Sequence, residues 1–338
     1  MRSTDLALYA QDRLRPGSRW FVEYGARLDR DGVLGRWNLT PRVGAAVLLN
    51  ESGTSVLRGG FGLFYERTPS VAGAFGQFEA ATDARFASDG VTLPGQPIRF
   101  PHVTAPDLRT ARSATWDLAY NYRLNAQWSF HATMLDRRGT NELILDPWQQ
   151  GESAELRLSS DGGSKYRDVE AGFQFSRAPG LDLNVSYSRS IARSDLNAFA
   201  NFFDAMLWPL IQPNAYGPAP SDVPHRLLAR GRIMPTGRWL FLGIADWRTG
   251  FPYSVVNDAL DFVGPRNTLR FPNRLHLDLG VERRFRIGKF QPWIGIRAYN
   301  ALDSFLPVDV QANLGSPAFG TFYNSEYRQL RLQVRFER

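Results

Sequence analysis

The side chains that could carry out catalysis or bind a metal are few in this sequence and lie far apart. The four histidines, His102, His131, His225 and His276, are isolated, and no pair has the spacing of an HExxH motif. Cysteine is absent, so neither thiol catalysis nor a cysteine-ligated zinc site is available. No acid, base and nucleophile are grouped in a way that supports a reaction. We therefore predict a protein that is not an enzyme, with no catalytic, cofactor-binding or metal-binding residues and no cofactor; its ligand-binding residues stay unassigned.

Two short motifs resemble ligand-binding loops, but a structural role explains both better. Gly59-Gly60-Phe61-Gly62 lacks the Gly-Lys-Ser/Thr that ends a phosphate loop, and it falls in a segment that alternates like a strand. Glycine there is expected to let the strand bend or a neighbouring group approach. Asp29-Arg30-Asp31-Gly32 begins like a calcium loop, but the other ligands do not follow at the required spacing. We predict an acidic turn there, and a structural role for His225 where a loop meets a strand.

The elements that dominate the sequence are strands, and the hairpin from Arg274 to Asn300 defines their pattern. From Leu275 to Val281 every second residue is Leu or Val, and the residues between are His, Asp or Gly. The second arm, from Phe290, repeats this alternation after a tight turn at residues 287–289. A period of two predicts strands with one apolar face. Each arm has about ten residues, which exceeds the usual strand of a soluble protein and suits a tilted strand that crosses a bilayer.

The same hairpin recurs along the whole chain, so we predict about 13 strands in an all-β, antiparallel, up-and-down transmembrane β-barrel. Six tight turns alternate with six longer connections, and short turns at one rim with long loops at the other are typical of outer-membrane barrels. The expected strands cover residues 5–14, 20–29, 40–49, 57–66, 116–123, 128–134, 169–176, 181–188, 225–233, 239–248, 274–282, 290–299 and 329–337. The expected long connections cover residues 31–39, 66–111, 138–165, 190–224, 249–273 and 301–327.

Composition excludes several other classes. No run of about eighteen apolar residues exists, which excludes a transmembrane helix. The net charge is +7, but arginine is spread over nearly every strand and no basic run gathers it, which argues against nucleic acid as a partner. A soluble β-sandwich or propeller is the alternative fold, although strands of this length are uncommon there. Aromatic residues expected near strand ends, where their rings can lie at the headgroup level, are Trp20, Tyr65, Trp116, Trp128, Tyr187, Trp239 and Tyr299.

Several segments together resemble the C-terminal barrel of Oar-like TonB-dependent receptors. Asn38-Leu39-Thr40-Pro41-Arg42-Val43-Gly44, followed by the segment from Val56 to Pro69 (VLRGGFGLFYERTP), resembles the paired-strand signature of that family. Each motif is weak alone, whereas the ordered set is specific and covers essentially the whole chain. Later family landmarks are matched in the expected order by residues 187–191 (YSRSI), 222–227 (DVPHRL), 248–253 (RTGFPY) and 299–303 (YNALD).

The resemblance implies a barrel of 22 strands around an N-terminal plug, in the outer membrane of a Gram-negative bacterium, with energy delivered by the inner-membrane protein TonB. Residues 1–338 are expected to be the C-terminal part of such a barrel, beginning near its tenth strand, because no plug, TonB-contacting segment or signal peptide is found. The implied partners are outer-membrane lipid, the β-barrel assembly machinery and, through the missing plug, TonB.

Three hypotheses for function follow. The first is the barrel of a TonB-dependent transporter, whose polar inner face and long loops shape a passage for an unidentified ligand. The second is a self-contained passive pore or surface adhesin, and the third is a soluble β-rich binding protein. In the first, a short helix expected from Asp195 to Trp208 folds over the barrel mouth or contacts an apolar ligand or partner. Its expected apolar residues are Leu196, Phe199, Phe202, Phe203, Met206 and Leu207.

Overall fold

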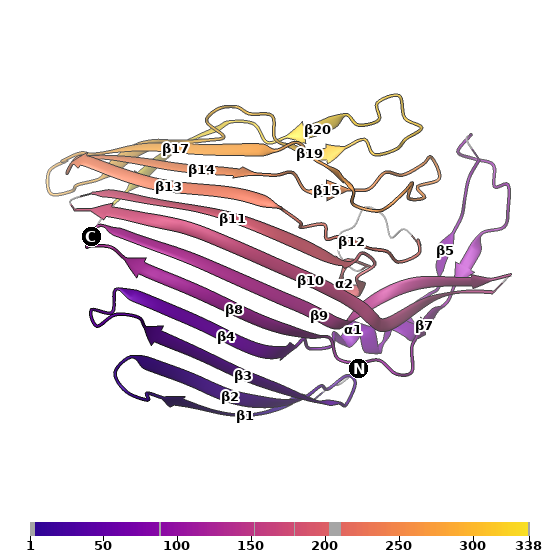
Figure 1. Cartoon of the computed structure of the whole chain (residues 1–338). Helices are drawn as coiled ribbons and strands as arrows, with labels where there is room; N and C mark the ends of the chain where they lie inside the picture. The colour runs from indigo at the N-terminus through magenta and orange to yellow at the C-terminus, as the bar shows by residue number, and fades with distance from the viewer. Residues whose placement is uncertain (1–3, 88, 152, 179, 203–210, 337–338) are drawn as a thin grey trace.

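One antiparallel sheet dominates the computed structural model, which describes residues 4–87, 89–151, 153–178, 180–202 and 211–336 (Figure 1). Within these ranges thirteen long strands pair in chain order, as the alternation predicts. They are β1 (Leu6–Leu14), β2 (Trp20–Arg30), β3 (Trp37–Leu48), β4 (Ser55–Tyr65), β8 (Arg112–Arg123), β9 (Trp128–Gln150), β10 (Ser153–Arg177), β11 (Leu181–Asp195), β13 (His225–Thr236), β14 (Trp239–Arg248), β17 (Arg274–Arg284), β18 (Trp293–Tyr299) and β21 (Gln329–Arg335).

The connections between these strands hold only short elements. The two α-helices in the described part of the chain have four residues each, and no helix there is long and apolar enough to cross a membrane. The short elements are α1 (Ser70–Gly73), η1 (Phe75–Gln77), β5 (Ala81–Asp83), β6 (Ile98–Phe100), β7 (His102–Thr104), α2 (Phe199–Phe202), β12 (Tyr216–Pro218), β15 (Pro252–Tyr253), β16 (Leu269–Arg270), β19 (Pro307–Val310) and β20 (Phe322–Ser325).

Short and long connections gather at opposite ends of the sheet (Figure 1). We call these the turn end, on the left of the figure, and the loop end, on the right. At the turn end the chain reverses tightly, helped by Gly53 and Gly288, whose φ angles of 65° and 60° suit residues without a Cβ. At the loop end lie the connections that the sequence predicts to be long. The predicted alternation of turns and loops is therefore confirmed, except at residues 138–165, where strands replace the predicted long connection.

The two faces of the sheet differ in chemistry because the side chains of each strand alternate. In one cross-strand row Gly243, Leu279 and Ala298 lie side by side on the apolar face, which we call the outer face. Leu279 is 48% exposed there. On the opposite, inner face, Glu282 is buried and accepts a hydrogen bond from Arg297. This arrangement fits a wall with lipid on one side and a polar interior on the other.

The predicted connection 138–165 is wrong, because strands occupy almost all of it. β9 continues to Gln150, and β10 begins at Ser153, so the two form a hairpin that extends far beyond the neighbouring strands at the loop end (Figure 1). The alternation is hidden in the sequence by an irregularity in the pairing: Asn141 has a φ of 58°, and the register shifts beside Gly162. An extra residue of this kind changes the phase of the pattern, so the strand reads as a loop.

A compact apolar core lies beside this extended hairpin, outside the long sheet. It joins the connection 66–111 to the hairpin and to α2, and β7 pairs in parallel with β10 along its edge. The connection 66–111 is therefore folded over the hairpin. The buried core residues are Ala72, Phe75, Phe100, Leu108, Leu145, Leu156, Leu158 and Phe199.

Several predicted boundaries also shift. β3 and β8 begin three or four residues earlier than predicted, and β11 continues to Asp195, so Trp116 and Tyr187 lie within strands and not near their ends. β18 begins at Trp293 and not at Phe290, since Pro292 has no N–H for the ladder. The aromatic residues at strand ends include Trp20, Tyr65, Trp128 and Trp239, as predicted, and Tyr299, which lies on the inner face.

Of the segment predicted to be a helix, Asp195 to Trp208, the structure describes residues 195–202, and the first four of these precede α2. Asp195 is the last residue of β11, and Leu196 follows it. The helix α2 covers Phe199–Phe202. Phe199 is 2% exposed and packs in the core beside the extended hairpin. The expected apolar residues Phe203, Met206 and Leu207 lie outside the described residues.

Candidate ligand-binding pocket at the loop end

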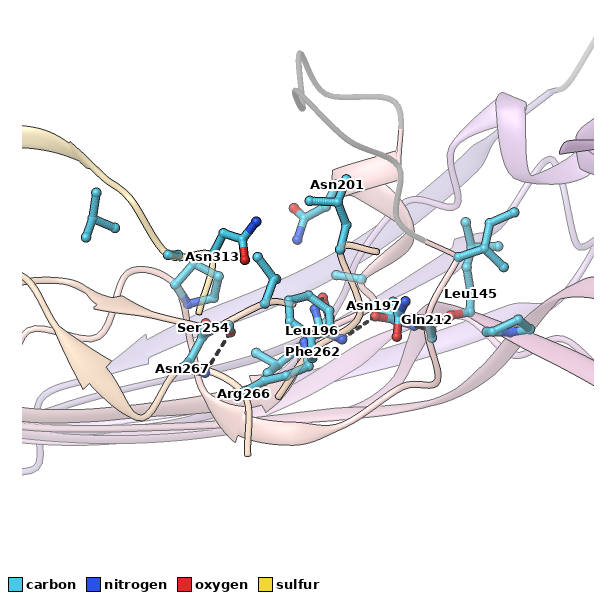
Figure 2. A pocket seen from close by; sticks show the side chains of 18 of the residues that line it. Leu145, Leu196, Asn197, Asn201, Gln212, Ser254, Phe262, Arg266, Asn267 and Asn313 are labelled. Carbon is cyan, nitrogen blue, oxygen red and sulfur yellow. Dashed lines mark hydrogen bonds between the residues drawn. The ribbon is translucent and has the colours of Figure 1, made fainter. Parts of the chain in front are cut away.

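A cavity of about 570 Å³ opens among the connections at the loop end (Figure 2). Its volume falls within the range of small-molecule sites. The extended hairpin and the connections that follow β11, β14 and β18 all contribute to it, so parts of the chain that are distant in sequence meet there. The lining mixes apolar and amide side chains, including Leu145, Leu196, Ile211, Phe262, Asn197, Asn201, Gln212, Asn267 and Asn313.

Asn197 holds the wall of this pocket to the extended hairpin. Its Nδ2 donates to the backbone oxygens of Leu145 (2.9 Å) and Gln212 (2.7 Å). The backbone N–H of Leu145 donates back to the carbonyl oxygen of Asn197 at 2.9 Å. A single amide side chain thus joins β9 to two parts of the connection after β11, around Asn197 and at Gln212. Because these bonds use backbone groups that would otherwise be unpaired, they fix the shape of the pocket.

Arg266 supplies the charge in the pocket. Among the lining residues that the structure describes it is the one with a charged side chain. Its Nη1 donates to Asn197 Oδ1 at 2.6 Å, and its guanidinium lies 4.2 Å from the centroid of the Phe262 ring. Burial lowers the pKa of Arg266 to about 10, so the side chain is still a cation at neutral pH. Its Nε is buried without a hydrogen-bond partner in the described residues.

The opposite wall is held by polar contacts of its own. The Ser254 hydroxyl donates to Asn267 Oδ1 and accepts from the Asn267 backbone N–H, both at 2.9 Å (Figure 2). Asn313 Nδ2 donates to Asp258 Oδ1 at 3.0 Å. These bonds tie the connection after β14 to itself and to the connection after β18. The amides that they orient can donate to or accept from a bound molecule.

The acidic group nearest in sequence to this wall is directed to other partners. Asp261 Oδ1 accepts a hydrogen bond from Gln212 Nε2 at 3.0 Å, and Asp261 forms an ion pair with Arg85 of the connection 66–111. Asp261 is absent from the residues that line the cavity. The charge of Arg266 is therefore not balanced by a carboxylate in the described lining, and the pocket favours an anionic or carbonyl-rich molecule.

The four histidines lie apart, as the sequence indicates. On the inner face, His131 Nε2 is 3.0 Å from Glu170 Oε1, and His276 forms a similar pair with Asp278. His102 stacks on a phenylalanine ring in the connection 66–111. In the described part of the chain no three His, Asp or Glu residues form a group that could hold a metal ion.

His225 lies at the first position of β13, so the predicted junction between a loop and a strand is confirmed. Its Nδ1 is 2.7 Å from the hydroxyl of Tyr187, and its backbone N–H donates to Thr249 Oγ1 at 3.2 Å. These contacts connect β13 to β11 and to the residue that follows β14.

The glycine motif and the acidic turn also have the structural roles that the sequence predicts. A Cβ on Gly60 would lie 3.0 Å from Asp117 Oδ1, so the missing side chain allows a close approach between β4 and β8. The Asp31 carboxylate accepts backbone hydrogen bonds from Val33, Leu34 and Thr68. Burial alone would raise the pKa of Asp31, but these hydrogen bonds outweigh burial and lower it.

Sequence reasoning assigned none of the polar pocket residues to a site. Asn197, Gln212 and Arg266 lie in connections without periodicity, and their partners are more than a dozen residues away along the chain. One signal was available: Gly264-Pro265 directly before Arg266 indicates a tight turn that can hold a side chain in place. Leu196, expected to be part of an apolar helix, lines the pocket.

Solved structures with the same fold are outer-membrane receptors and transporters. The outer membrane transporter YddB from Escherichia coli has a TM-score of 0.69 at 14% identity, and the ferric enterobactin receptor PfeA from Pseudomonas aeruginosa (R480A_Q482A mutant) has a TM-score of 0.68 at 14%. The FrpB iron transporter from Neisseria meningitidis has a TM-score of 0.61 at 15%. Each match covers 98% of this chain but only 44% of the solved chain, so this chain spans less than half the length of these proteins.

A family model settles the relationship that the fold indicates. A search of curated proteins found no match. In contrast, residues 1–315 match the model described as TonB dependent receptor-like, beta-barrel. Barrels of this family are outer-membrane proteins of Gram-negative bacteria. The match covers nearly the whole chain, and it agrees with the antiparallel strands, the short turns and the long loops. The chain therefore belongs to the TonB-dependent receptor β-barrel family.

Proposed function

We propose that this chain forms strands and extracellular loops of an outer-membrane transporter that takes up a ligand with energy delivered through TonB. The observation that carries this proposal is the pocket around Arg266, which opens at the loop end of a sheet with a polar inner face. In such a barrel the loop end faces the medium, so a ligand would meet the pocket before it enters the barrel. Membership of the family and the transporters of the same fold support the proposal.

The chemistry of the pocket indicates the class of ligand. The guanidinium of Arg266 favours an anionic or carbonyl oxygen, and the surrounding amides offer further hydrogen bonds. Leu145, Leu196 and Phe262 offer apolar contact. We expect a small molecule with acidic or carbonyl groups and an apolar part.

We also propose that the chain is the C-terminal part of a longer receptor of the Oar-like group, with the plug and the other barrel strands elsewhere in the same polypeptide. The match covers only 44% of the length of the solved transporter, which supports this proposal. In the described sheet β1 pairs only with β2, and β21 only with β18. An edge left open in lipid would cost several kcal/mol for each unpaired backbone group. An antibody against the β17–β18 turn should detect a band well above 38.1 kDa in the outer-membrane fraction of the source cell.

Energy-coupled uptake is tested with cells that carry or lack the gene. Both are grown in the same medium, with and without a protonophore, and mass spectrometry follows which small molecules disappear. We expect an acidic compound whose depletion requires both the gene and the proton gradient. Gene-dependent depletion that persists with the protonophore, together with ion conductance by the native protein in a planar bilayer, would instead establish a passive pore.

A further inference from the structure

The outer face of β9 changes from apolar to charged towards the loop end. Trp128, at the turn end, packs 4.6 Å from the ring of Phe175, and the outward positions up to Met134 are apolar. The next two outward positions are Asp136 and Arg138. Charged side chains on the lipid side of a barrel strand are costly at the bilayer midplane, and the cost falls near the interface. The position of these charges along the strand therefore matters.

Cations occupy the same level on the strands beside β9. In one row Arg138 of β9 pairs with Lys165 of β10, which pairs with Arg193 of β11. Arg167 lies one outward position closer to the turn end, and Arg189 follows on β11. Because residues paired across strands point to the same face, all these side chains lie on the outer face. Together with one arginine of β8, they form a cationic patch made of Arg112, Arg138, Lys165, Arg167, Arg189 and Arg193.

Asp136 lies within this patch and orients two of its arginines. Asp136 is only 1% exposed. Its carboxylate accepts hydrogen bonds from Arg167 (2.8 and 3.0 Å) and Arg138 (3.3 Å). A buried carboxylate between two guanidiniums balances one charge and leaves a surplus. The side chains of Lys165 and Arg189 form no hydrogen bond or ion pair with any residue in the described ranges.

The carboxylate of Asp195, next to the patch, is bound by other groups and does not neutralise the patch. Asp195, the next outward position after Arg193 on β11, accepts hydrogen bonds from the Gly163 backbone N–H at 2.7 Å and from Asn214 Nδ2 at 2.6 Å. Arg193 itself lies 5.4 Å from the centroid of the Tyr216 ring. The patch therefore keeps a positive surplus next to the apolar outward positions of β9.

The height of the patch fits the membrane interface. From Trp128 to Arg138 a strand rises about 33 Å at roughly 3.3 Å per residue, which is about 25 Å along the membrane normal at the usual tilt. The apolar band of such barrels is also about 25 Å tall. With aromatic rings at the turn end, the patch therefore lies at the opposite edge of the band, at the level of lipid headgroups on the loop side. Ile191 and Val169, both about half exposed, place apolar surface directly beside it.

We infer that this patch binds the phosphate groups of an anionic glycolipid in the outer leaflet. Guanidinium groups bind phosphate oxygens in pairs, and an arginine pair held by Asp136 is already oriented for this. The exposed aliphatic residues would contact the acyl chains of the same molecule. The inference rests on the proposed place of the chain in the outer membrane, but it concerns the outer face and is independent of the pocket around Arg266.

The test compares two double variants of the native protein, purified from outer membranes in mild detergent. Lys165→Gln/Arg189→Gln removes the two patch cations without a partner in the described structure. Arg58→Gln/Arg230→Gln removes the same charge from the inner face of β4 and β13 and is the control. Native mass spectrometry measures the phosphorylated glycolipid retained by each protein. We expect the amount of glycolipid retained by the patch variant to fall about tenfold or more, and the amount retained by the control to match the wild type.

Equal retention by patch variant and control would overturn the inference. If the patch variant lacks the heat-sensitive folded band on a gel, wild-type protein is tested in vesicles with lipid A or with dephosphorylated lipid A. If the protein prefers the phosphorylated lipid even in excess inorganic phosphate, the glycolipid site is supported. Equal binding to both lipids rejects it. Failure of the proposed function would be seen earlier, as absence of the protein from the outer-membrane fraction.

Discussion

Glu282 of β17 and Arg335 of β21 form an ion pair of 3.1 Å although the strand β18 lies between their own strands. The other carboxylate oxygen of Glu282 accepts a hydrogen bond at 3.2 Å from Arg297 of β18. Glu282 is only 2% exposed, so a single buried carboxylate connects the last three long strands on the inner face.

Replacing this carboxylate should weaken that end of the sheet. Glu282→Gln keeps the shape but loses both charge-assisted contacts, and we expect the free energy of unfolding to fall by about 1–3 kcal/mol. Urea titration of the protein in vesicles, followed by the heat-dependent gel shift, measures the change. Glu51→Gln is the control: its side chain is 90% exposed beside Arg19, so the change should be below about 1 kcal/mol. An equal effect of the two variants would contradict this role.

The assignment of outer and inner faces is tested at two neighbouring positions of β17. Leu279→Arg places a charge on the outer face, and we expect a loss of about 2–4 kcal/mol if the residue lies near mid-bilayer. Asp278→Asn, on the inner face, should cost much less because its surroundings are polar. Unfolding in vesicles with the same lipid measures both. If the two substitutions destabilise the protein equally, the faces are wrongly assigned.

The charge of the pocket is tested by Arg266→Gln. Gln keeps a hydrogen-bond donor but removes the cation beside Phe262, and we expect the affinity for an acidic ligand to fall about tenfold or more. The measurement is the ligand concentration that gives half-maximal uptake. Arg99→Gln, an exposed position of β6 outside the lining, should leave uptake unchanged. A similar loss in both variants would point to a general effect of charge and not to the pocket.

The link between two long connections should depend on pH. Hydrogen bonds from Gln212, Asn257 and Arg85, the first being the strongest, lower the pKa of Asp261 below its usual 3.8, although burial opposes them. Because the folded pKa is the lower one, the link is fully present above about pH 4 and is lost as the pH falls through the folded value. We therefore expect the connections 66–111 and 249–273 to separate only in acid.

This separation can be measured with spin labels, since the chain has no cysteine of its own. Labels on cysteines placed at Val91 and Val263, both exposed, report the distance between the connections. Asp261→Asn should give at neutral pH the distance that the unchanged residue gives in acid. A distance that is the same at neutral pH in Asp261→Asn and in the unchanged protein would show that the ion pair with Arg85 does not hold the connections together.

The long strands could be predicted because each one carries its own pattern. Alternation from Leu275 to Val281, or from Trp239 to Arg248, reports a half-buried strand without reference to other parts of the chain. The extended β9–β10 hairpin was missed because the irregular pairing at Asn141 and Gly162 shifts the phase of its pattern. A single extra residue is enough to hide an otherwise regular strand.

The pocket could not be predicted for a different reason. The amide of Asn197 has a role only because folding places the carbonyl oxygens of Leu145 and Gln212 beside it. The same holds for Arg266, whose burial depends on Phe262 and on the connection after β11. No local pattern reports such contacts, since the residues lie in connections that have no periodicity.

The chain-order pairing of the thirteen strands has a consequence for assembly. Each long strand of the described sheet pairs with the long strands next to it in sequence, and only the short β7 joins β10 from farther away. The pairing of the long strands therefore does not have to wait for a distant part of the chain. Even the connection 66–111 adds little entropic cost, because each doubling of loop length costs only about 0.6 kcal/mol. The sheet can therefore grow one hairpin at a time, with a single advancing edge that each new strand covers.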